Sequence, residues 1–472
     1  MSQFEQLLEE LKASAALQRD KAETLYAQLA DSLAEAIGNG KLKPGERLPP
    51  HRDFASALGV NITTVTKAMA VLQQKGLVES RPGRGTQVAQ PRHPAAQFQS
   101  APSNDPATVD LSVNRPATDG FNRVLAQLLP RLASDPRFGD MKDYHPSEGP
   151  PWAREAAAQW LRHTGVEAHG SQMLIAEGAQ HGIASTLRSL TNSGDTVLAD
   201  SVTYQGINAL CRSLGLILVG VDADERGMSP EALRQACAEH QPRLLFLVPS
   251  IHNPTAITLD AERREALAAV IRETDLLVIE DDVYRPLLDQ SPPAFAALLP
   301  ERTIYISALS KCIAPGLRMG FVMAPPALLQ DIAAMQRIDC WSTSPLTALI
   351  ATRLIEDGHA EQLVAEQREE LRARQALLAS QLEGLEVAHS ATGTHAWLIL
   401  PEPWTGSRFA RLCHDRGVVL LAGGAFTLRP ELSPQAVRIN ISAALSREQL
   451  IKALKVISQL ARQGHLHMHN RI

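Results

Sequence analysis

Lys311 is the residue whose type and place in the sequence point most directly to chemistry. It lies in the segment 307–318, SALSKCIAPGLR, which follows the β-branched run TIYI at 303–306. It is therefore expected on a loop just past the end of a strand, where α/β proteins place their ligands. A lone lysine there is most often a surface residue, but four further motifs accompany it: GAQ at 178–180, NPT at 253–255, DDVY at 281–284 and VRI at 437–439. Each is a weak signal alone, and the five in this order predict a ligand site.

A second group of candidate residues lies within a helix-turn-helix predicted in the first ninety positions. An apolar stripe with a spacing of four predicts a helix that ends at 38–40: Leu25, Leu29, Leu33 and Ile37. A short helix over about 52–58 should stop at Gly59, and Asn61 can cap the helix that follows. The inward face of that helix is Val65, Ala68, Met69 and Leu72. Two helices joined across a three-residue turn that contains glycine form a helix-turn-helix.

The outward face of the second helix carries side chains that can reach phosphates or base edges in a DNA major groove: Thr63, Thr64, Thr66 and Lys67. After it, LVES, RPGRG and TQVA at 77–89 predict a β-hairpin whose tip carries Arg81 and Arg84. Such a wing suits a minor groove or a phosphate. Periodicity alone leaves the alternative open that these are ordinary surface helices with solvated charges.

The elements that position these residues fall into a module at 1–90, a proline-rich linker at 91–107 and a large domain at 108–472. The linker has no apolar periodicity and cannot form a core. In the large domain, the run RLLFLV at 243–248, the helical pattern at 260–273 and LLVI at 276–279 follow one another. Strand, helix and strand in that order predict a parallel α/β sheet.

Charge is distributed unevenly along the chain. Lys plus Arg is 46 and Asp plus Glu is 51, and this net charge of −5 alone argues against nucleic-acid binding by bulk positive charge. Residues 41–90, however, carry eight basic and three acidic side chains, or +5, while residues 1–40 carry −4. A basic module is thus embedded in an acidic protein.

The remaining composition indicates a reduced, cytoplasmic chain. The five cysteines lie far apart without a Cys-x-x-Cys spacing, so no cysteine-based metal site is expected. No signal peptide is visible, and no run of eighteen apolar residues predicts a membrane span.

The string at 40–88, GKLKPGERLPPHRDFASALGVNITTVTKAMAVLQQKGLVESRPGRGTQV, closely resembles the GntR-type winged helix-turn-helix. The resemblance implies that five residues contact double-stranded operator DNA: Arg52, Thr64, Lys67, Arg81 and Arg84. One departure is His51, where such proteins often have Ser or Glu.

From about Val109 onward, the five motifs and the stretch YHPSEGPPWAREAAAQWLRHTG at 144–165 resemble the fold type I, aminotransferase-like family. The resemblance implies bound pyridoxal 5′-phosphate (PLP), a mainly parallel central sheet and a smaller C-terminal α+β subdomain. Trp152 stands where leucine is usual in that stretch, and two further positions depart from the family pattern. Ala308 stands where a hydroxyl residue is usual, and Ala256 stands where glycine is usual.

The same resemblance implies a role for each motif residue. Lys311 would form the Schiff base with PLP, and Asp281 would pair with the pyridine nitrogen and keep it protonated. Asn253 and Tyr284 would hydrogen-bond the phenolic oxygen, and Tyr204 would stack on the ring. The phosphate would be held by Ala179, Gln180, Ser310 and Arg318. Arg438 would grip the carboxylate of an amino acid.

Several of these residues also have a purely structural interpretation. Arg438 could be part of a structural ion pair, and Tyr204 could be a half-buried strand aromatic. Conversely, His252, His395 and Trp397 could line the ligand pocket, although such residues are more often part of the core.

A GntR-like winged helix joined by a proline-rich linker to an aminotransferase-like domain is the arrangement of the MocR-type regulators, and the chain resembles that subfamily over nearly its full length. The resemblance implies a transcriptional regulator that forms a head-to-tail homodimer. PLP, with an amino acid or amine effector, would then modulate operator binding. The alternative is a catalytically active PLP-dependent aminotransferase that carries an accessory DNA-binding domain.

Overall fold

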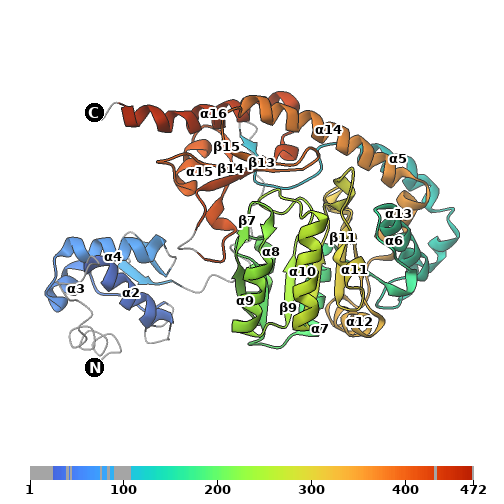
Figure 1. Cartoon of the computed structure of the whole chain (residues 1–472), viewed down its shortest axis with the longest axis horizontal. Coiled ribbons are helices and arrows are strands. Elements are labelled where there is room, and N and C mark those ends of the chain that lie inside the picture. The colour runs from blue at the N-terminus through green and yellow to red at the C-terminus, as the bar shows by residue number, and fades with distance from the viewer. Residues whose placement is uncertain are drawn as a thin grey trace. The chain divides into compact units, whose positions relative to one another are not determined.

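The computed structural model divides the chain into two compact units, Met1–Gln99 and Ser100–Ile472 (Figure 1). The structure describes residues 25–38, 42, 45–74, 77–81, 85–89, 108–429 and 433–469. The linker predicted at 91–107 and the predicted wing residue Arg84 lie outside these ranges.

The first unit contains the predicted helix-turn-helix and hairpin. Its helices are α2 (Leu25–Gly38), α3 (His51–Leu58) and α4 (Ile62–Gln74). Its strands are β1 (Val78–Arg81) and β2 (Gly85–Val88), which pair antiparallel with Val78 opposite Val88. Gly59 ends α3 with φ of +66°, a left-handed conformation that favours glycine, and its N–H bonds back to the helix. The winged helix-turn-helix predicted from the sequence is confirmed.

The core of the first unit explains why these short elements hold together. All four residues predicted to face inward from α4 are buried: Val65, Ala68, Met69 and Leu72. They pack in one cluster with Leu29 and Leu33 of α2 and Phe54 of α3. Spacing of apolar residues at i, i+3, i+4 and i+7 therefore places one stripe of each helix in a shared core.

The second unit is built on a seven-stranded sheet of order β4, β12, β11, β10, β9, β5, β6. The bounds are β4 (Met173–Ala176), β5 (Thr196–Asp200), β6 (Ile217–Val221), β9 (Leu244–Leu247), β10 (Leu277–Asp281), β11 (Thr303–Ala308) and β12 (Gly320–Met323). Strand β12 runs antiparallel to both of its neighbours, and the other pairs are parallel. The mainly parallel sheet is thus confirmed.

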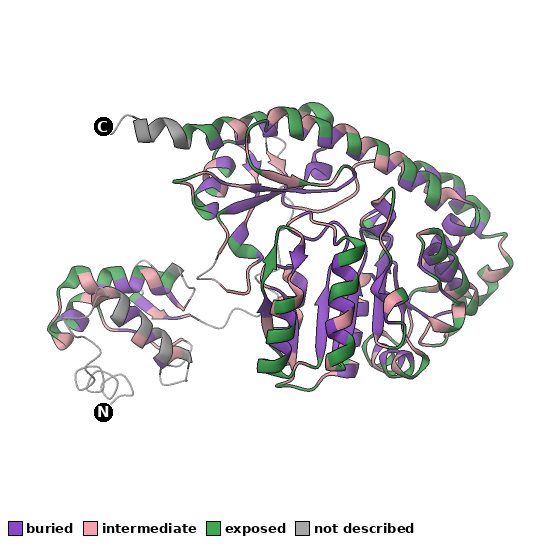
Figure 2. Cartoon of the chain, in the orientation of Figure 1, coloured by how far each residue is buried: buried purple, intermediate pink, exposed green. Residues whose placement is uncertain are grey.

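Helices cover the sheet on both faces, so the strands are buried while the outer helix faces are exposed (Figure 2). These helices are α6 (Pro151–His163), α7 (Ala179–Leu190), α8 (Gln205–Leu214), α9 (Pro230–His240), α10 (Ala261–Thr274), α11 (Phe295–Leu298) and α12 (Pro326–Cys340). Helix α13 (Pro345–Glu356) packs on α6. Alternate residues of β9 enter different cores: Leu244 and Phe246 pack in one cluster, Leu245 and Leu247 in another. A strand buried on both faces reads as a continuous apolar run, as in RLLFLV. The hairpin of β7 (Ala223–Asp224) and β8 (Gly227–Met228) follows the edge strand β6.

The smaller C-terminal subdomain is α+β, as expected. Its antiparallel sheet has the order β13 (Val387–His389), β14 (Ala396–Ile399), β17 (Ala436–Ile439) and β16 (Leu421–Ala422). Its helices are α14 (His359–Gln381), α15 (Gly406–His414) and α16 (Arg447–His469), and α5 (Gly120–Leu132) packs on α14. The two-residue strand β3 (Val109–Asp110) pairs with β15 (Val418–Val419), which ties the start of the second unit to its end.

No single helix among the described residues is long and apolar enough to cross a membrane. Among the described helices, one pair, α3 with most of α4, has the combined length and composition of a membrane span. The two helices are bent by 116° at the turn between them.

Candidate functional site

A cavity of about 120 Å³ lies at the carboxyl ends of the parallel strands in the second unit. It is lined by every residue that the sequence assigns to the cofactor: Ala179, Gln180, Tyr204, Asn253, Asp281, Tyr284, Ser310, Lys311 and Arg318. These residues come from the ends of β4, β5, β9, β10 and β11 or from the segments that follow them, and the segment after β11 leads to β12. The topology brings them together because the parallel strands β5, β9, β10 and β11 all end at the same edge of the sheet.

Lys311 lies on the loop after β11, as predicted, and is partly buried. Its Nζ donates a hydrogen bond to the backbone carbonyl of Asn114 at 3.2 Å. Burial lowers the pKa of the amine to about 8, and the positive charge of Arg438 acts in the same direction. A lysine whose pKa is lowered in this way is unprotonated near neutral pH far more often than an ordinary lysine, and the unprotonated amine is the nucleophile.

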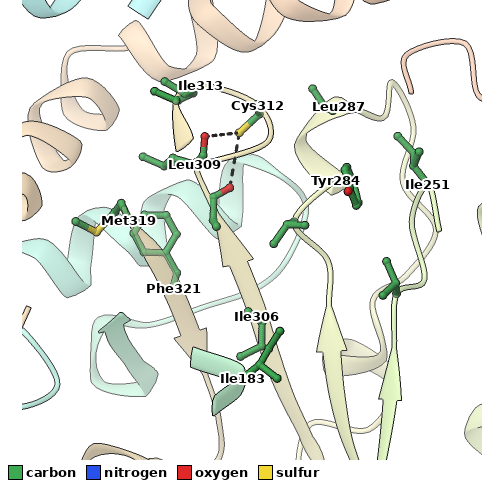
Figure 3. Close-up of a cluster of buried hydrophobic side chains, with 14 of the residues drawn as sticks. Ile183, Ile251, Tyr284, Leu287, Ile306, Leu309, Cys312, Ile313, Met319 and Phe321 are labelled. Carbon is green, nitrogen blue, oxygen red and sulfur yellow. Dashed lines mark hydrogen bonds between the residues drawn. The ribbon is translucent and has the colours of Figure 1, made fainter. Parts of the chain in front are cut away.

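The loop around Lys311 is anchored by its apolar neighbours. Leu309, Cys312 and Ile313 point into the hydrophobic core together with Met319 and Phe321 (Figure 3). The Cys312 Sγ also contacts the backbone carbonyls of Ala308 and Leu309, both at 3.8 Å. The lysine is therefore presented from a fixed backbone.

Asp281 ends β10 and is buried on the floor of the cavity. Its Oδ1 has no hydrogen-bond partner among the described residues. Burial raises the pKa of this carboxyl to about 7, the neighbouring Asp282 raises it further, and Lys311 opposes the shift. An unsatisfied buried acceptor of this kind requires a donor, and a protonated pyridine nitrogen would supply one.

The part of the cavity lined by the start of α7 has the features of an anion site. Ala179 and Gln180 begin α7, so the positive end of the helix dipole faces the cavity. The Arg318 guanidinium lies directly against Gly178. A Cβ at position 178 would come within 2.6 Å of this guanidinium, so only glycine leaves room for it. Gly178 also has φ of +85°, and Arg318 Nη2 donates to the carbonyl of Glu177 at 2.8 Å. This close approach places a guanidinium beside the helix N-terminus.

The two cavity tyrosines and Asn253 are held by hydrogen bonds within the protein. The Tyr204 hydroxyl donates to Gln180 Oε1 at 3.0 Å, and burial raises its pKa. The Tyr284 hydroxyl accepts from Asn114 Nδ2 at 2.7 Å, and Asn253 Oδ1 accepts from Arg438 Nη1 at 2.7 Å. The polar side chains around the ring position are therefore fixed in orientation.

Arg438 does not line this cavity but lies behind Asn253 on β17. The Arg438 Nη2 donates a hydrogen bond to the carbonyl of Ser112 at 2.7 Å. The guanidinium lies 4.8 Å from the centre of the Phe426 ring. The Nε has no hydrogen-bond partner among the described residues. Burial lowers its pKa to about 10. Within the described part of the chain no carboxylate forms an ion pair with it.

Ser112 and Asn114 contact the predicted site residues and were not predicted from the sequence. Both follow β3, and they contact Arg438, Lys311 and Tyr284. A two-residue strand has no detectable periodicity, and neutral side chains in a loop carry no chemical signature. Only the pairing of β3 with β15 brings this segment to the cavity.

The other three aromatic residues singled out from the sequence do not line the cofactor cavity. His395 Nε2 bonds to the carbonyl of His252 at 3.0 Å, and burial lowers its pKa to about 3. Trp397 packs against Phe426 with ring centres 5.9 Å apart. His252 lines a different cavity.

In the first unit, Arg52 is exposed on α3 and Lys67 is exposed on α4, whereas Thr64 is half-buried. The Lys67 Nζ lies 5.6 Å from the centre of the Tyr26 ring of α2. Arg81 ends β1, which begins the wing.

The N-terminus of α4 is capped as predicted. Asn61 Oδ1 accepts from the backbone N–H of Thr63 at 3.0 Å and from its hydroxyl at 2.9 Å. His51 Nδ1, the departure noted from the GntR pattern, lies 3.3 Å from the Thr66 hydroxyl across the two helices.

Comparison with known proteins matches both units. Residues 25–88 match the bacterial regulatory proteins of the gntR family, and residues 106–457 match the aminotransferase class I and II family. HTH-type transcriptional regulator YdeF of Bacillus subtilis (strain 168) is 31% identical over 93% of this chain and 95% of its own length. HTH-type transcriptional regulator TauR of Rhodobacter capsulatus is 25% identical over 85% of this chain and 90% of its own length.

Solved structures show the same fold in the second unit. An archaeal alanine:glyoxylate aminotransferase has a TM-score of 0.70 at 25% identity and covers 75% of this chain and 91% of its own. LysN, the α-aminoadipate aminotransferase of Thermus thermophilus, has a TM-score of 0.70 at 23% identity and covers 79% and 97%. That structure is complexed with N-(5′-phosphopyridoxyl)-L-leucine. Family and fold indicate PLP as the cofactor, and the orphaned Asp281 oxygen and the anion site at α7 fit it. The chain belongs to the aminotransferase class I and II family and, over nearly its full length, to the HTH-type transcriptional regulators that join a GntR domain to such a domain.

Proposed function

We propose that this protein is a cytoplasmic regulator in which PLP, together with an amino acid or amine effector, modulates operator binding by a homodimer. The observation that carries the proposal is the complete cofactor cavity in a chain whose first unit is a winged helix-turn-helix. A cofactor site of this kind can bind amines, and a winged helix can bind DNA. An effector modulates DNA binding if its affinity differs between two arrangements of the protein.

Each cavity residue has a task toward PLP. When bound, PLP supplies an aldehyde that condenses reversibly with amines and a ring that accepts electrons. Lys311 would hold the cofactor covalently, and Asp281 would keep the ring nitrogen protonated. Asn253 and Tyr284 would donate to the phenolic oxygen while Tyr204 stacks on the ring. The phosphate would be held by Ala179, Gln180, Ser310 and Arg318.

Arg438 would bind the carboxylate of an amino acid effector. Its Nη1 and Nη2 already donate to Asn253 and to the Ser112 carbonyl, so an incoming carboxylate would share or displace these contacts. Asn253 also lines the cofactor cavity. A carboxylate bound to Arg438 would therefore change the contacts that Asn253 makes with the cofactor.

The DNA contacts would come from α3, α4 and the wing: Arg52, Thr64, Lys67, Arg81 and Arg84. Arg52 and Lys67 are exposed and positively charged, as phosphate or base contacts require. A homodimer would present two such modules to two half-sites.

The proposal is tested by comparing wild type with Lys311→Ala and Arg52→Ala. Wild type loaded with PLP should be yellow, and borohydride should attach the cofactor irreversibly to Lys311. Lys311→Ala should lose this attachment, and its affinity for DNA from upstream of its own gene should no longer respond to PLP or amines. Arg52→Ala should weaken DNA binding by about tenfold and leave the PLP absorbance unchanged. A wild-type protein that takes up no PLP, or whose DNA affinity ignores PLP and every amine tried, contradicts the proposal.

A second candidate function, transamination, is favoured by one relative. The 2-aminoadipate transaminase of Thermus thermophilus is 28% identical over 60% of this chain and 72% of its own length. Single-turnover assays with a panel of amino acids decide between sensing and turnover. Production of the corresponding keto acid would show catalysis, and binding without keto acid would leave sensing alone.

A further inference from the structure

A second cavity, of about 300 Å³, lies in the large unit beside the cofactor cavity and shares only Val248 with it. It opens between the end of β5, the segment after β9 and the β7–β8 hairpin. Its rim carries the charged residues Asp222, Asp224 and Arg429, while Asp200 and His252 lie buried inside. None of the residues assigned above to the cofactor, to the effector carboxylate or to DNA lines this cavity.

Asp200 is the last residue of β5 and is only 8% exposed. Burial raises the pKa of its carboxyl to about 7. Within the described ranges no lysine or arginine pairs with it, and the nearest basic atom is His252 Nε2 at 3.6 Å. A buried carboxylate without a cationic partner is costly, so this group favours the arrival of a cation.

The other two carboxylates of the cavity already have arginine partners. Asp222 accepts from Arg429 Nη1 at 2.9 Å and from the Ser201 hydroxyl at 3.0 Å. Asp224 accepts from Arg263 Nη2 at 2.7 Å. Asp200 is therefore the carboxylate of this cavity that is available to a ligand.

His252 contributes a second acceptor aimed at the same place. Its Nδ1 lies 2.8 Å from the Thr255 hydroxyl, and its buried Nε2 has no hydrogen-bond partner among the described residues. Burial lowers its pKa to about 4, so the ring is neutral near pH 7. When Nδ1 donates to Thr255 and Asp200 is ionised, Nε2 and the Asp200 carboxylate are both acceptors, and a donor that lies between them would satisfy both.

The remaining walls are apolar and consist mainly of Val202, Leu247, Ile257 and Leu259. We propose that this cavity is a second ligand site that takes a small aliphatic ammonium ion. The ammonium N–H groups donate to Asp200 and His252, and the hydrocarbon chain lies against the apolar walls. The site is separate from the amine-binding chemistry of PLP, and it does not depend on the proposed regulatory function.

The test uses full-length protein loaded with PLP and reduced with borohydride, so that amines can no longer condense with the cofactor. Calorimetry at pH 8, where the Asp200 carboxyl is ionised, measures the binding of n-pentylammonium. Wild type should bind it, and Asp200→Asn should bind at least about tenfold more weakly because a charge-assisted hydrogen bond is lost. Glu225→Gln is the matched control, because Glu225 is exposed on the β7–β8 turn and does not line the cavity. It should bind the probe as wild type does.

Equal affinities of wild type and Asp200→Asn, or no binding by wild type at millimolar probe, overturn the proposal. Should Asp200→Asn fail to fold, wild type is compared with n-pentanol, which has the same chain without the charge. A clear preference for pentylammonium supports the proposal, and equal binding of the two overturns it. Loss of the PLP response of DNA binding would leave these results unaffected, so the two proposals fail separately.

Discussion

Asp281 shows how one residue links cofactor binding to stability. In the cofactor-free protein its buried carboxyl has a pKa of about 7 in place of the usual 3.8. A raised folded-state pKa means that the unfolded chain ionises first as the pH rises. The contribution of the Asp281 carboxyl to the free energy of unfolding is therefore complete below about pH 4 and is lost progressively as the pH rises to about 7.

We expect Asp281→Asn to flatten this pH dependence in the cofactor-free protein. Because asparagine does not titrate, wild type should lose up to ~4 kcal/mol of unfolding free energy relative to the variant between about pH 4 and pH 7. Urea unfolding of both proteins, after PLP has been removed, measures the difference. In the proposed arrangement bound PLP would supply a positive partner for Asp281 and should reduce the loss in wild type. If the free energy of unfolding falls equally with pH in the two cofactor-free proteins, the Asp281 carboxyl does not have the raised pKa on which this prediction depends.

The sequence motifs predict residues that the fold brings to one cavity, but not the partners that hold them in place. Lys311, Asp281 and Asn253 could be predicted because an amine, a carboxylate and an amide occur in recognisable motifs at strand ends. Ser112 and Asn114 could not, because their role depends on the pairing of β3 with β15 across more than three hundred residues. Ala256 adopts φ of +61°, the left-handed conformation that explains why glycine is usual there.

At the scale of elements, α4 is where periodicity predicts most. Spacing alone assigns its four inward residues, and all are buried, because an amphipathic helix has only one way to bury its stripe. The turn residues predict the wing, and the paired part of it is confirmed by the β1–β2 register. Its tip at Arg84 lies outside the described residues.

The Asn61 cap should be needed for α4 to present its outward face. Asn61→Ala removes the acceptor for both the N–H and the hydroxyl of Thr63 and should cost about 1 kcal/mol of stability in the first unit. Asn61→Ser keeps a capping oxygen and should cost little. Thermal unfolding of the full-length variants measures this, and equal loss in both variants would mean that the cap contributes nothing.

Lys67, exposed on the same helix, should act through DNA phosphates. Lys67→Ala should weaken binding to all DNA sequences about equally and lower the slope of log affinity against log salt by about 1. Lys452→Ala is the control, since Lys452 is exposed on α16 of the other unit. Titrations at several salt concentrations distinguish the two. An unchanged slope for Lys67→Ala would remove this residue from the phosphate contacts.

At the scale of the whole molecule, the net charge of −5 conceals the DNA-binding function. Affinity for DNA depends on the local charge of the surface that meets the phosphates and only weakly on the total, and the segment 41–90, which holds the helix-turn-helix and the wing, carries +5. An acidic remainder disfavours non-specific binding and leaves recognition to the winged helix. Charge must therefore be counted by unit before a class of function is excluded.

One group of exposed apolar residues in the second unit is the surface at which we expect the two copies of the proposed homodimer to meet. Tyr144 is 84% exposed, Ile338 is 77% exposed and Trp341 is 50% exposed. The Tyr144 and Trp341 rings lie 5.4 Å apart, and the Arg337 guanidinium lies 4.8 Å from the Trp341 ring centre. Large apolar side chains gathered in this way are typical of a surface that another protein covers, and the proposed homodimer would cover it.

Ile338→Glu should therefore convert the dimer to a monomer, because it places a charge in an apolar contact. Sedimentation should show the change in mass, and affinity for a DNA fragment with two half-sites should fall by about a hundredfold because the second module no longer binds as part of the same particle. Binding to a single half-site should be unchanged, since α3 and α4 are untouched. Leu445→Glu, at an equally exposed leucine of the small subdomain, serves as the control and should leave the mass unchanged. A dimeric Ile338→Glu protein would place the interface elsewhere, and a monomeric wild type that still binds two half-sites tightly would contradict the dimer itself.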